Sequence, residues 1–449
     1  MSHRKKAISS LGDIAEHLVT YAQAKGADES QVSIADSLEF SLDVRLGKIE
    51  NLVEAGITSL ALKIIKDKKT AWATSSDLSP ETLKNLVVKA IDRAQVTNPD
   101  PFAGLPDLSP FSIKPSSLKL YDPEIPRLET KTKIAVAKEA EKIAMADKRI
   151  TNSHGASLET REIKHVLANS HGFLHQYSET FCSLSLGLQA GDPDNKVEDF
   201  WFSAQRFWKD LESPAEIAKK AVERTVRQLN PRKIKTQKVP VIFEPMMTSW
   251  LLGFLFACIS GVSIYQKASF LVGKLHQKIA NKKVNIYDHG LLPGKLGSRP
   301  FDSEGVPCQK TAVIEKGVLK NYLCNSYAAR KLKLMSTGNA EGTGVSPNNF
   351  YLVPDDNSPQ NIINSLEKGL ILIRTIGHGL NPLTGEISKG AFGLWVEKGE
   401  VKFPVSEITI SGQLGEILNN IEIIGNDPDW RSLLAGPTIK IKELMVAGE

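Results

Sequence analysis

The sequence predicts an α+β fold: a duplicated helix–β-sheet–helix N-terminal half, then a β-rich C-terminal domain carrying one buried apolar helix. Three observations predict it. The same order of helical and alternating patterns occurs twice before residue 230, hairpin patterns dominate after it, and residues 245–266 contain no charged side chain. A chain of 449 residues is also too long for a single hydrophobic core.

The first unit is read from periodicity and capping residues. Apolar residues at helical spacing predict a helix over residues 11–25. Strict alternation over residues 38–44 predicts a half-buried strand, and residues 58–65 predict another. Ser79, followed by Pro80, is typical of a helix start and predicts the second helix.

The second unit repeats this order. Residues 131–147 predict a helix, residues 169–172 a turn, and the alternation over residues 182–188 a strand. A capping box over residues 213–216 predicts the closing helix. The repeated order indicates a duplicated α+β module.

Proline-rich and polar stretches mark the boundaries. Seven prolines between residues 99 and 126 predict a semi-rigid connector, and a polar break near residue 231 precedes the C-terminal half. There, residues 313–319 and 394–401 predict hairpins that turn at Lys-Gly, and residues 408–410 a short strand. The predicted segments are residues 1–98 (first unit), 99–127 (connector), 128–230 (second unit) and 231–449 (C-terminal domain).

Composition narrows the class of protein. With 41% hydrophobic and 24% charged residues the chain resembles a soluble globular protein, and a net charge of +5 is too small to indicate a nucleic-acid partner. The four cysteines have no C-x-x-C spacing, which favours reduced thiols in the cytoplasm. No apolar signal region follows the basic N-terminus, so we expect no export.

The charge-free stretch at residues 245–266 has three readings: a membrane span, a core helix, or a catalytic helix without its catalytic side chains. Its length suffices for a span. It contains several Ser, Thr and Gly residues, however, and its flanks lack a clear positive asymmetry. A buried helix is therefore favoured, and no membrane partner is expected.

Few motifs carry chemistry. None of the nine histidines is followed by glutamate, so no zinc-peptidase helix motif is present, and the predicted turn argues against a ligand pair at His171 and His175. No Gly-x-Ser-x-Gly elbow occurs. Cys258 has no basic neighbour in sequence, which favours an inert core thiol over a nucleophile.

Three loops remain as candidate sites. Asp302 and Glu304 could contact substrate or a hard metal, although stabilising a turn is the commoner role of such residues. The glycine-rich loop over residues 338–344 lacks the spacing of a nucleotide cradle. His378, between two glycines, is either a general base or an ordinary loop residue.

Several segments together resemble the TldD/PmbA family, once described as modulators of DNA gyrase and now regarded as metallopeptidase complexes. The resemblance covers essentially the whole C-terminal half in order, and the duplicated N-terminal half agrees with it. The segments are ISGVSIYQKASFL at residues 259–271, PFDSEGV at 300–306, SYAARKL at 326–332, STG at 336–338, GAFGLWVEKGE at 390–400, PVSEITISG at 404–412 and IGND at 424–427.

The resemblance implies a subunit without catalytic residues. TldD-type subunits carry His-Glu-x-x-x-His on a helix and a later cysteine as the third zinc ligand. By resemblance Gly253, Phe254 and Cys258 occupy the motif positions here, and no cysteine follows Cys324. The chain thus resembles the TldE/PmbA-type subunit, and we expect no metal or other cofactor in it, with zinc only in a TldD-type partner.

By the same resemblance, this chain pairs with a TldD-type subunit in a heterodimer that degrades or processes small or unfolded peptides, and it could form a homodimer alone. We expect its role to be structural, completing a peptide channel. The candidate channel residues are Asp302, Glu304, Thr337, Gly338, Asn339 and His378.

Two other hypotheses compete with this one. The chain could be an autonomous hydrolase that uses the thiol of Cys258 or the imidazole of His378. It could also be a non-enzymatic adaptor linked to DNA gyrase or to a toxin–antitoxin system, for which the family's older name is the only support.

Overall fold

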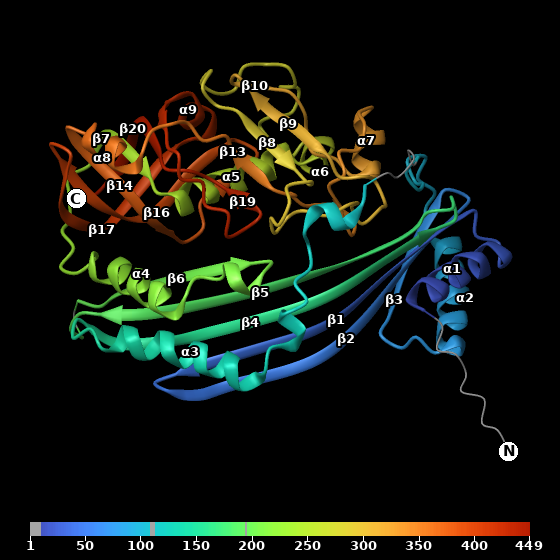
Figure 1. The fold of residues 1–449 in the computed structure, drawn as a ribbon. Helices are drawn as coiled ribbons and strands as arrows, with labels where there is room; N and C mark the ends of the chain where they lie inside the picture. The colour runs from blue at the N-terminus through green and yellow to red at the C-terminus, as the bar shows by residue number, and fades with distance from the viewer. Residues whose placement is uncertain (1–9, 108–112, 194) are drawn as a thin grey trace.

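The computed structural model describes residues 10–107, 113–193 and 195–449. Its N-terminal half is built on one long, curved antiparallel sheet of six strands, in the order β3-β2-β1-β4-β5-β6 (Figure 1). The elements of this half are α1 Leu11–Ala24, β1 Glu29–Arg45, β2 Lys48–Lys66, β3 Lys69–Ser75, α2 Pro80–Val96, η1 Pro115–Leu118, η2 Ile125–Arg127, α3 Thr130–Met145, β4 Ile150–Asn169, β5 Leu174–Ala190, β6 Val197–Gln205, η3 Trp208–Asp210 and α4 Pro214–Val226.

The predicted duplication is confirmed. Each unit runs helix, three strands, helix. The first strands of the two units, β1 and β4, pair antiparallel at the centre of the sheet, from Gln31 opposite Asn169 to Val44 opposite Ala156. The two units therefore share one sheet, with β2 and β3 on one side of the centre and β5 and β6 on the other.

The two pairs of helices cover one face of this sheet. Helices α1 and α2 pack on Val32 and Ile34 at one end. Helices α3 and α4 pack on Leu42 and Val44 at the other end. All four of these side chains are even-numbered residues of β1, so they point to the same face because side chains alternate along a strand.

Capping agrees with the sequence. Ser213 opens α4 with the predicted capping box, because its hydroxyl accepts from the Glu216 N–H and the Glu216 carboxylate accepts from the Ser213 N–H. Ser79 precedes Pro80 at the start of α2, also as predicted. Its hydroxyl, however, donates to Asp77 rather than accepting from the helix.

The C-terminal domain is β-rich, as predicted. Strands β14, β7, β20, β17 and β16 close into a ring, because β14 pairs with both β7 and β16. A second sheet has the order β10-β9-β8-β13-β19. The elements are β7 Gln237–Phe243, α5 Pro245–Ile259, α6 Gly261–Tyr265, β8 Ile286–His289, β9 Lys310–Glu315, β10 Val318–Leu319, α7 Ser326–Leu332, β11 Ala340–Glu341, β12 Gly344–Val345, β13 Phe350–Leu352, α8 Pro359–Asn364, β14 Lys368–Ile376, β15 Leu380–Asn381, β16 Glu386–Glu397, β17 Glu400–Gln413, α9 Leu414–Asn419, β18 Ile421–Ile424, β19 Leu434–Ala435 and β20 Ile439–Ala447.

Both predicted Lys-Gly hairpins are present. Lys316 and Gly317 have φ angles of 48° and 78°, and Lys398 and Gly399 have 52° and 74°. Two consecutive positive φ values define a type I′ turn, whose twist matches that of the strands. The predicted short strand at residues 408–410 is part of the longer β17.

The charge-free stretch forms a buried helix, as predicted, but it is interrupted. Helix α5 ends at Ile259 and the short α6 begins at Gly261. The break coincides with a close approach of two chain segments, since a Cβ on Gly261 would lie 2.5 Å from the sulfur of Cys324. Among the described residues, no helix is long and apolar enough to cross a membrane.

Arg206 connects the sheet to the C-terminal domain through hydrogen bonds to both. Its Nη1 donates to the Glu179 carboxylate at 2.6 Å, and its Nη2 donates to the carbonyl oxygen of Leu296 at 2.6 Å. The His165 ring contacts the other oxygen of Glu179 at 3.0 Å. Although burial of Glu179 acts in the opposite direction, Arg206 and His165 lower the pKa of this carboxyl from its ordinary 4.5 to about 2.

We expect Arg206→Ala to destabilise the protein by about 3–5 kcal/mol, because it leaves the Glu179 carboxylate buried without its cation. Arg161→Ala is the matched control, since the Arg161–Glu39 pair is exposed and contributes less than about 1 kcal/mol. Urea unfolding followed by tryptophan fluorescence measures both. Equal losses in the two variants would contradict this role of Arg206.

The cost of Arg206→Ala also depends on pH. The folded-state pKa of Glu179 lies below its unfolded value, so its contribution to stability is present above pH 4.5 and lost as pH falls toward about 2. We therefore expect the difference in unfolding free energy between wild type and Arg206→Ala to shrink between pH 6 and pH 3. A difference that stays constant or grows on acidification would contradict this assignment.

Candidate functional site

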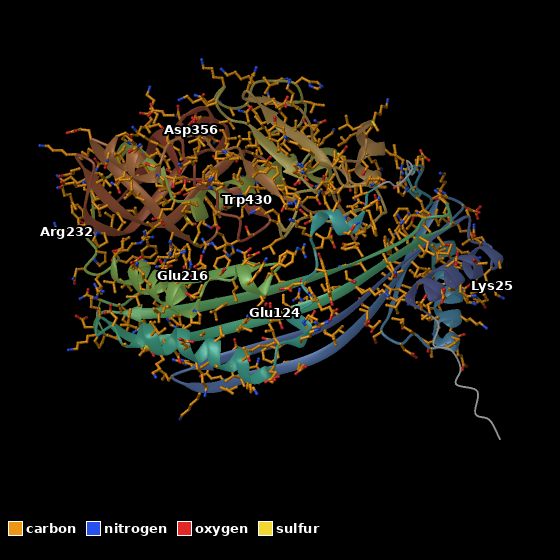
Figure 2. All side chains as sticks on the ribbon, in the orientation of Figure 1. Lys25, Glu124, Glu216, Arg232, Asp356 and Trp430 are labelled. Atoms are coloured by element: carbon orange, nitrogen blue, oxygen red, sulfur yellow. The ribbon has the colours of Figure 1, made fainter. Side chains whose placement is uncertain are left out.

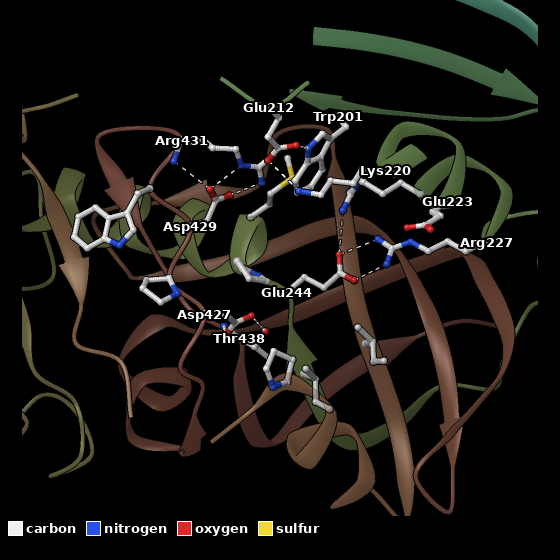
Figure 3. A pocket seen from close by; sticks show the side chains of 18 of the residues that line it. Trp201, Glu212, Lys220, Glu223, Arg227, Glu244, Asp427, Asp429, Arg431 and Thr438 are labelled. Atoms are coloured by element: carbon white, nitrogen blue, oxygen red, sulfur yellow. Dashed lines mark hydrogen bonds and ion pairs between the residues drawn. The ribbon is translucent and has the colours of Figure 1, made fainter. Parts of the chain in front are cut away.

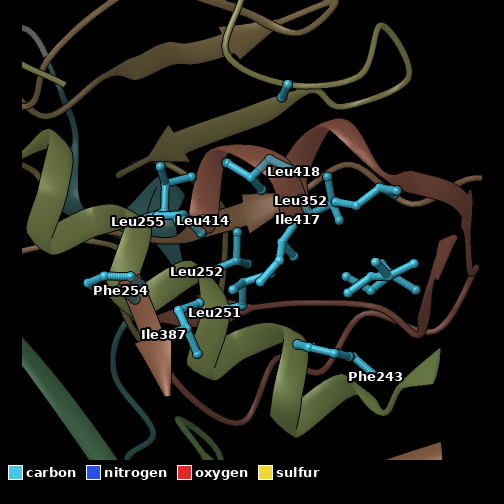
Figure 4. Close-up of a cluster of buried hydrophobic side chains, with 14 of the residues drawn as sticks. Phe243, Leu251, Leu252, Phe254, Leu255, Leu352, Ile387, Leu414, Ile417 and Leu418 are labelled. Atoms are coloured by element: carbon cyan, nitrogen blue, oxygen red, sulfur yellow. The ribbon is translucent and has the colours of Figure 1, made fainter. Parts of the chain in front are cut away.

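Helix α5 is the core element on which the two β layers of the C-terminal domain meet. It contacts β7 and β14 of the ring and β13 and β19 of the second sheet. Leu251, Leu252 and Leu255 are buried in one cluster with side chains of both layers, including Leu352 of β13 and Ile387 of β16 (Figure 4). Burial on nearly all sides explains why the sequence of this helix carries no charge.

The three motif positions lie on two faces of α5. Phe254 and Cys258 point into the core and are 3% and 0% exposed, whereas Gly253 is half-buried. Ala257, one turn after Gly253, is exposed. Residues four apart share a helix face, so the accessible face of α5 carries Gly253 and Ala257 at these positions. Ala257 was missed by the sequence analysis, although its spacing from Gly253 could have identified it.

This face offers no side chain that ligates a metal. Gly253 and Ala257 have no donor atoms, and Cys258 points away from them. Among the described residues, no group of three or more His, Cys, Asp or Glu side chains could hold a metal ion. A zinc site in a protein needs at least three such ligands.

The candidate channel residues form a buried hydrogen-bonding network. Asp302, which is 1% exposed, accepts from the N–H groups of Glu304, Val306 and Ala340. Glu304 accepts from the N–H of Ser326. Burial, followed by the nearby Glu304 carboxylate, raises the pKa of Asp302. Both carboxylates therefore hold backbone in place around the loop.

Thr337, Gly338 and Asn339 continue this network. The Thr337 hydroxyl donates to the Asn339 side chain at 2.7 Å, and Asn339 donates to the Asp288 carboxylate at 2.8 Å. Burial raises the pKa of Asp288 to about 6, although hydrogen bonds from Asn339 and Asn348 act in the opposite direction. Gly338 has a φ of 71° that suits glycine, and its carbonyl accepts from Asn348.

The predicted histidines lie elsewhere. His378 is exposed on the loop after β14 and is not brought to this network. His171 lies in the predicted turn, and its Nε2 is 3.0 Å from the carboxylate of Glu29. His175 packs edge-on against Phe173. The structure thus brings together five of the six candidate channel residues.

Several cavities lie where the C-terminal domain meets the N-terminal half, and two of them are lined by residues of α5 or of the candidate loop. One, of about 330 Å³, is bounded by the sheet on one side and by Arg299, Asp302 and Glu341 on the other. Asp302 is therefore the predicted channel residue that borders this cavity. The other, of about 600 Å³, lies between α4 and the first turn of α5 (Figure 3).

Paired charges line the larger cavity. Glu244, which precedes α5, binds Arg224 on α4 at 3.2 Å and Arg227, the residue directly after α4, at 2.6 Å (Figure 3). The Arg431 guanidinium lies 3.6 Å from the centre of the Trp201 ring. Trp430, beside Arg431, lies on the side of the C-terminal domain that faces the sheet (Figure 2). The sequence analysis missed this site, because its members are far apart in the chain.

Three family models match the chain in order. They describe PmbA/TldA metallopeptidase domain 1 over residues 31–94, the central domain over residues 123–229, and the C-terminal domain over residues 236–448. The chain is 35% identical to the metalloprotease PmbA of Escherichia coli O157:H7 over 424 residues, which cover 94% of this chain and 93% of that protein.

Solved structures agree. A protein of Thermotoga maritima named a modulator of DNA gyrase superposes with a TM-score of 0.89 at 29% identity, covering 96% of this chain and 98% of that one. TldE from Thermococcus kodakarensis has the same fold, with a TM-score of 0.85 at 24% identity and coverage of 96% and 99%. The fold, with α5 in its C-terminal domain, is thus that of the metallopeptidase domains that the three family models describe. This chain is a member of the PmbA/TldD metallopeptidase family.

We expect the four cysteines of the folded protein to be unreactive toward a thiol reagent. Burial raises the pKa of Cys182, Cys258 and Cys324 from 9.0 to about 12, and it also raises that of Cys308. A pKa of about 12 lowers the thiolate fraction at neutral pH about a thousandfold, and the thiolate is the reactive form. Four thiols per chain should react once the protein is unfolded.

Ala257→Cys is the matched control for this measurement. It places a thiol on the accessible face of α5, directly beside the buried Cys258, and it should react rapidly in the folded state. Rapid labelling of Cys258 in the wild-type protein would contradict the assignment of the two helix faces.

Proposed function

We propose that this chain is the non-catalytic, TldE/PmbA-type subunit of a two-subunit zinc peptidase that acts on small or unfolded peptides. The observation that carries the proposal is the accessible face of α5, which presents Gly253 and Ala257 and no ligating side chain. Membership of a metallopeptidase family supports a role in proteolysis. Zinc would then be held by a TldD-type partner, which supplies the catalytic residues.

The buried thiols argue against an autonomous thiol hydrolase. Nucleophilic cysteines have lowered pKa values and lie beside a base or a cation. Burial instead raises the pKa of Cys258 to about 12, and its side chain lies in an apolar core cluster. His378 is exposed on a loop, whereas Cys258 is buried, so the imidazole is not placed to activate this thiol.

We expect the purified chain to contain far less than one zinc ion per molecule and to cleave no peptide alone. Mixed with a TldD-type subunit, it should yield zinc-dependent cleavage of an unstructured fluorogenic peptide. Elemental analysis by mass spectrometry and the cleavage assay measure the two properties.

The control is the same mixture with a TldD-type subunit in which one motif histidine has been replaced by alanine. This change should abolish cleavage without separating the subunits. One zinc per isolated chain, together with cleavage by that chain alone, would overturn the proposal. Full activity of the TldD-type subunit without this chain would overturn it as well.

A further inference from the structure

Two segments of the C-terminal domain carry lysines without matching acids. The first, residues 267–285, contains five lysines and no Asp or Glu, and no acidic residue occurs anywhere between Glu244 and Asp288. The second, residues 316–320, adds two lysines around the turn between β9 and β10. The net charge of the chain is only +5, so this excess of positive charge is local.

The backbone joins the two segments. The N–H of Ile279 donates to the carbonyl oxygen of Gly317 at 2.9 Å. Ile279 and Leu319 are buried, at 8% and 0% exposed, whereas the adjacent Lys278 is exposed. Strands β9 and β10 lie on the side of the C-terminal domain away from the large sheet (Figure 1). The segments therefore turn apolar side chains inward and present lysines on one outer surface.

Five lysines of these segments form what we call the basic patch: Lys274, Lys278, Lys282, Lys316 and Lys320. The first four are exposed and the last is half-buried. Within residues 10–107, 113–193 and 195–449, none of their ammonium groups forms an ion pair, and the lysine ion pairs of the C-terminal domain involve other positions. The charge of the patch is thus available to a ligand.

The carboxylates beside the patch have partners of their own. Glu315, directly before the turn, accepts from the Tyr287 hydroxyl at 3.0 Å. Glu422, whose carbonyl oxygen accepts from Lys283, has its carboxylate 3.7 Å from Lys440. The five patch lysines outnumber these two carboxylates. A positive surface of this kind attracts anions over a Debye length, about 10 Å at 0.1 M salt.

The composition of the patch indicates which anion it suits. Proteins that bind nucleic acid commonly use arginine forks on phosphates and aromatic rings on bases. Residues 274–285 and 316–320 contain no Arg, Phe, Tyr or Trp. The nearby Arg299 is only 15% exposed and binds Glu341 at 2.6 Å. Separate, flexible ammonium groups suit separate carboxylates, such as those spaced along an unfolded acidic peptide.

We propose that the basic patch binds acidic stretches of unfolded peptides and thereby favours acidic substrates for the peptidase complex. This inference rests on the proposed function, to which it adds a substrate class. The patch is distinct from the face of α5 that carries Gly253 and Ala257. A peptide held at a second contact has a raised effective concentration at the cleavage site.

Fluorescence anisotropy of the purified full chain with a fluorescein-labelled peptide of alternating Glu and Gly tests the proposal. The chain should bind this peptide, more weakly as salt rises from about 50 to about 200 mM, and it should not bind the same peptide with Gln for Glu. Lys274→Gln, Lys278→Gln, Lys282→Gln and Lys316→Gln, combined in one variant, should weaken binding about tenfold or more. Arginine at the same four positions should preserve it.

The matched control combines Lys84→Gln, Lys89→Gln, Lys142→Gln and Lys148→Gln. These lysines of the N-terminal half are exposed, and their replacement removes the same number of charges. Binding should be unchanged in this variant, and circular dichroism should show all variants folded. No binding by the wild-type chain at low salt, or equal weakening in the two glutamine variants, would overturn the proposal. Tighter binding of duplex DNA than of the acidic peptide would overturn the assigned ligand class.

The outcome is separable from that of the proposed function, because binding is measured on the chain alone and requires neither zinc nor cleavage. Loss of acidic-peptide binding with cleavage intact in the mixture with a TldD-type subunit overturns only the patch. Binding without any cleavage in that mixture overturns only the peptidase role.

Discussion

The pairing of Glu179 with Arg206 is the interaction on which the arrangement of the whole molecule depends. The helices cover one face of the large sheet with apolar side chains, whereas the face toward the C-terminal domain combines apolar contacts, such as Tyr177 against Phe301, with buried charges. Charged groups can be buried at such a contact only if they are paired, because removing an unpaired charge from water costs several kcal/mol. Arg206 meets this condition twice, through the carboxylate of Glu179 and the carbonyl oxygens of the loop at residues 295–298.

The local structure was predictable from the sequence, because it is decided by neighbouring residues. The capping box at Ser213, the turns at Lys316 and Lys398, and the alternation before Val44 each specify their element within a few positions. The sharing of one sheet by two units, and the closure of β14 onto β16, were not predictable. Those pairings join residues far apart in the chain, and their register depends on tertiary packing rather than on local pattern.

The candidate site was predictable only in part, for the same reason. The sequence identified Asp302 and Glu304 as two nearby carboxylates, but their N–H partners at Ala340 and Ser326 are supplied by distant segments. Glu244 stood at the border of the charge-free stretch, and nothing nearby in sequence indicated that Arg224 and Arg227 would bind it. A buried carboxylate is interpretable only with its donors, since they decide whether it is structural or free to react.

The apolar composition of α5 is a consequence of its packing. A Cβ at Gly253 would lie 3.1 Å from the side chain of Leu434, and Phe256 packs edge-on against Phe350 at 5.9 Å between ring centres. A side chain at position 253 would therefore require the side chain of Leu434, on β19, to shift. Cores packed at this density resist such insertions at a cost of about 1–3 kcal/mol. A single substitution that introduces a histidine at position 253 therefore loses packing energy before any metal can bind. This cost favours the present role of α5, a core helix that joins the two β layers.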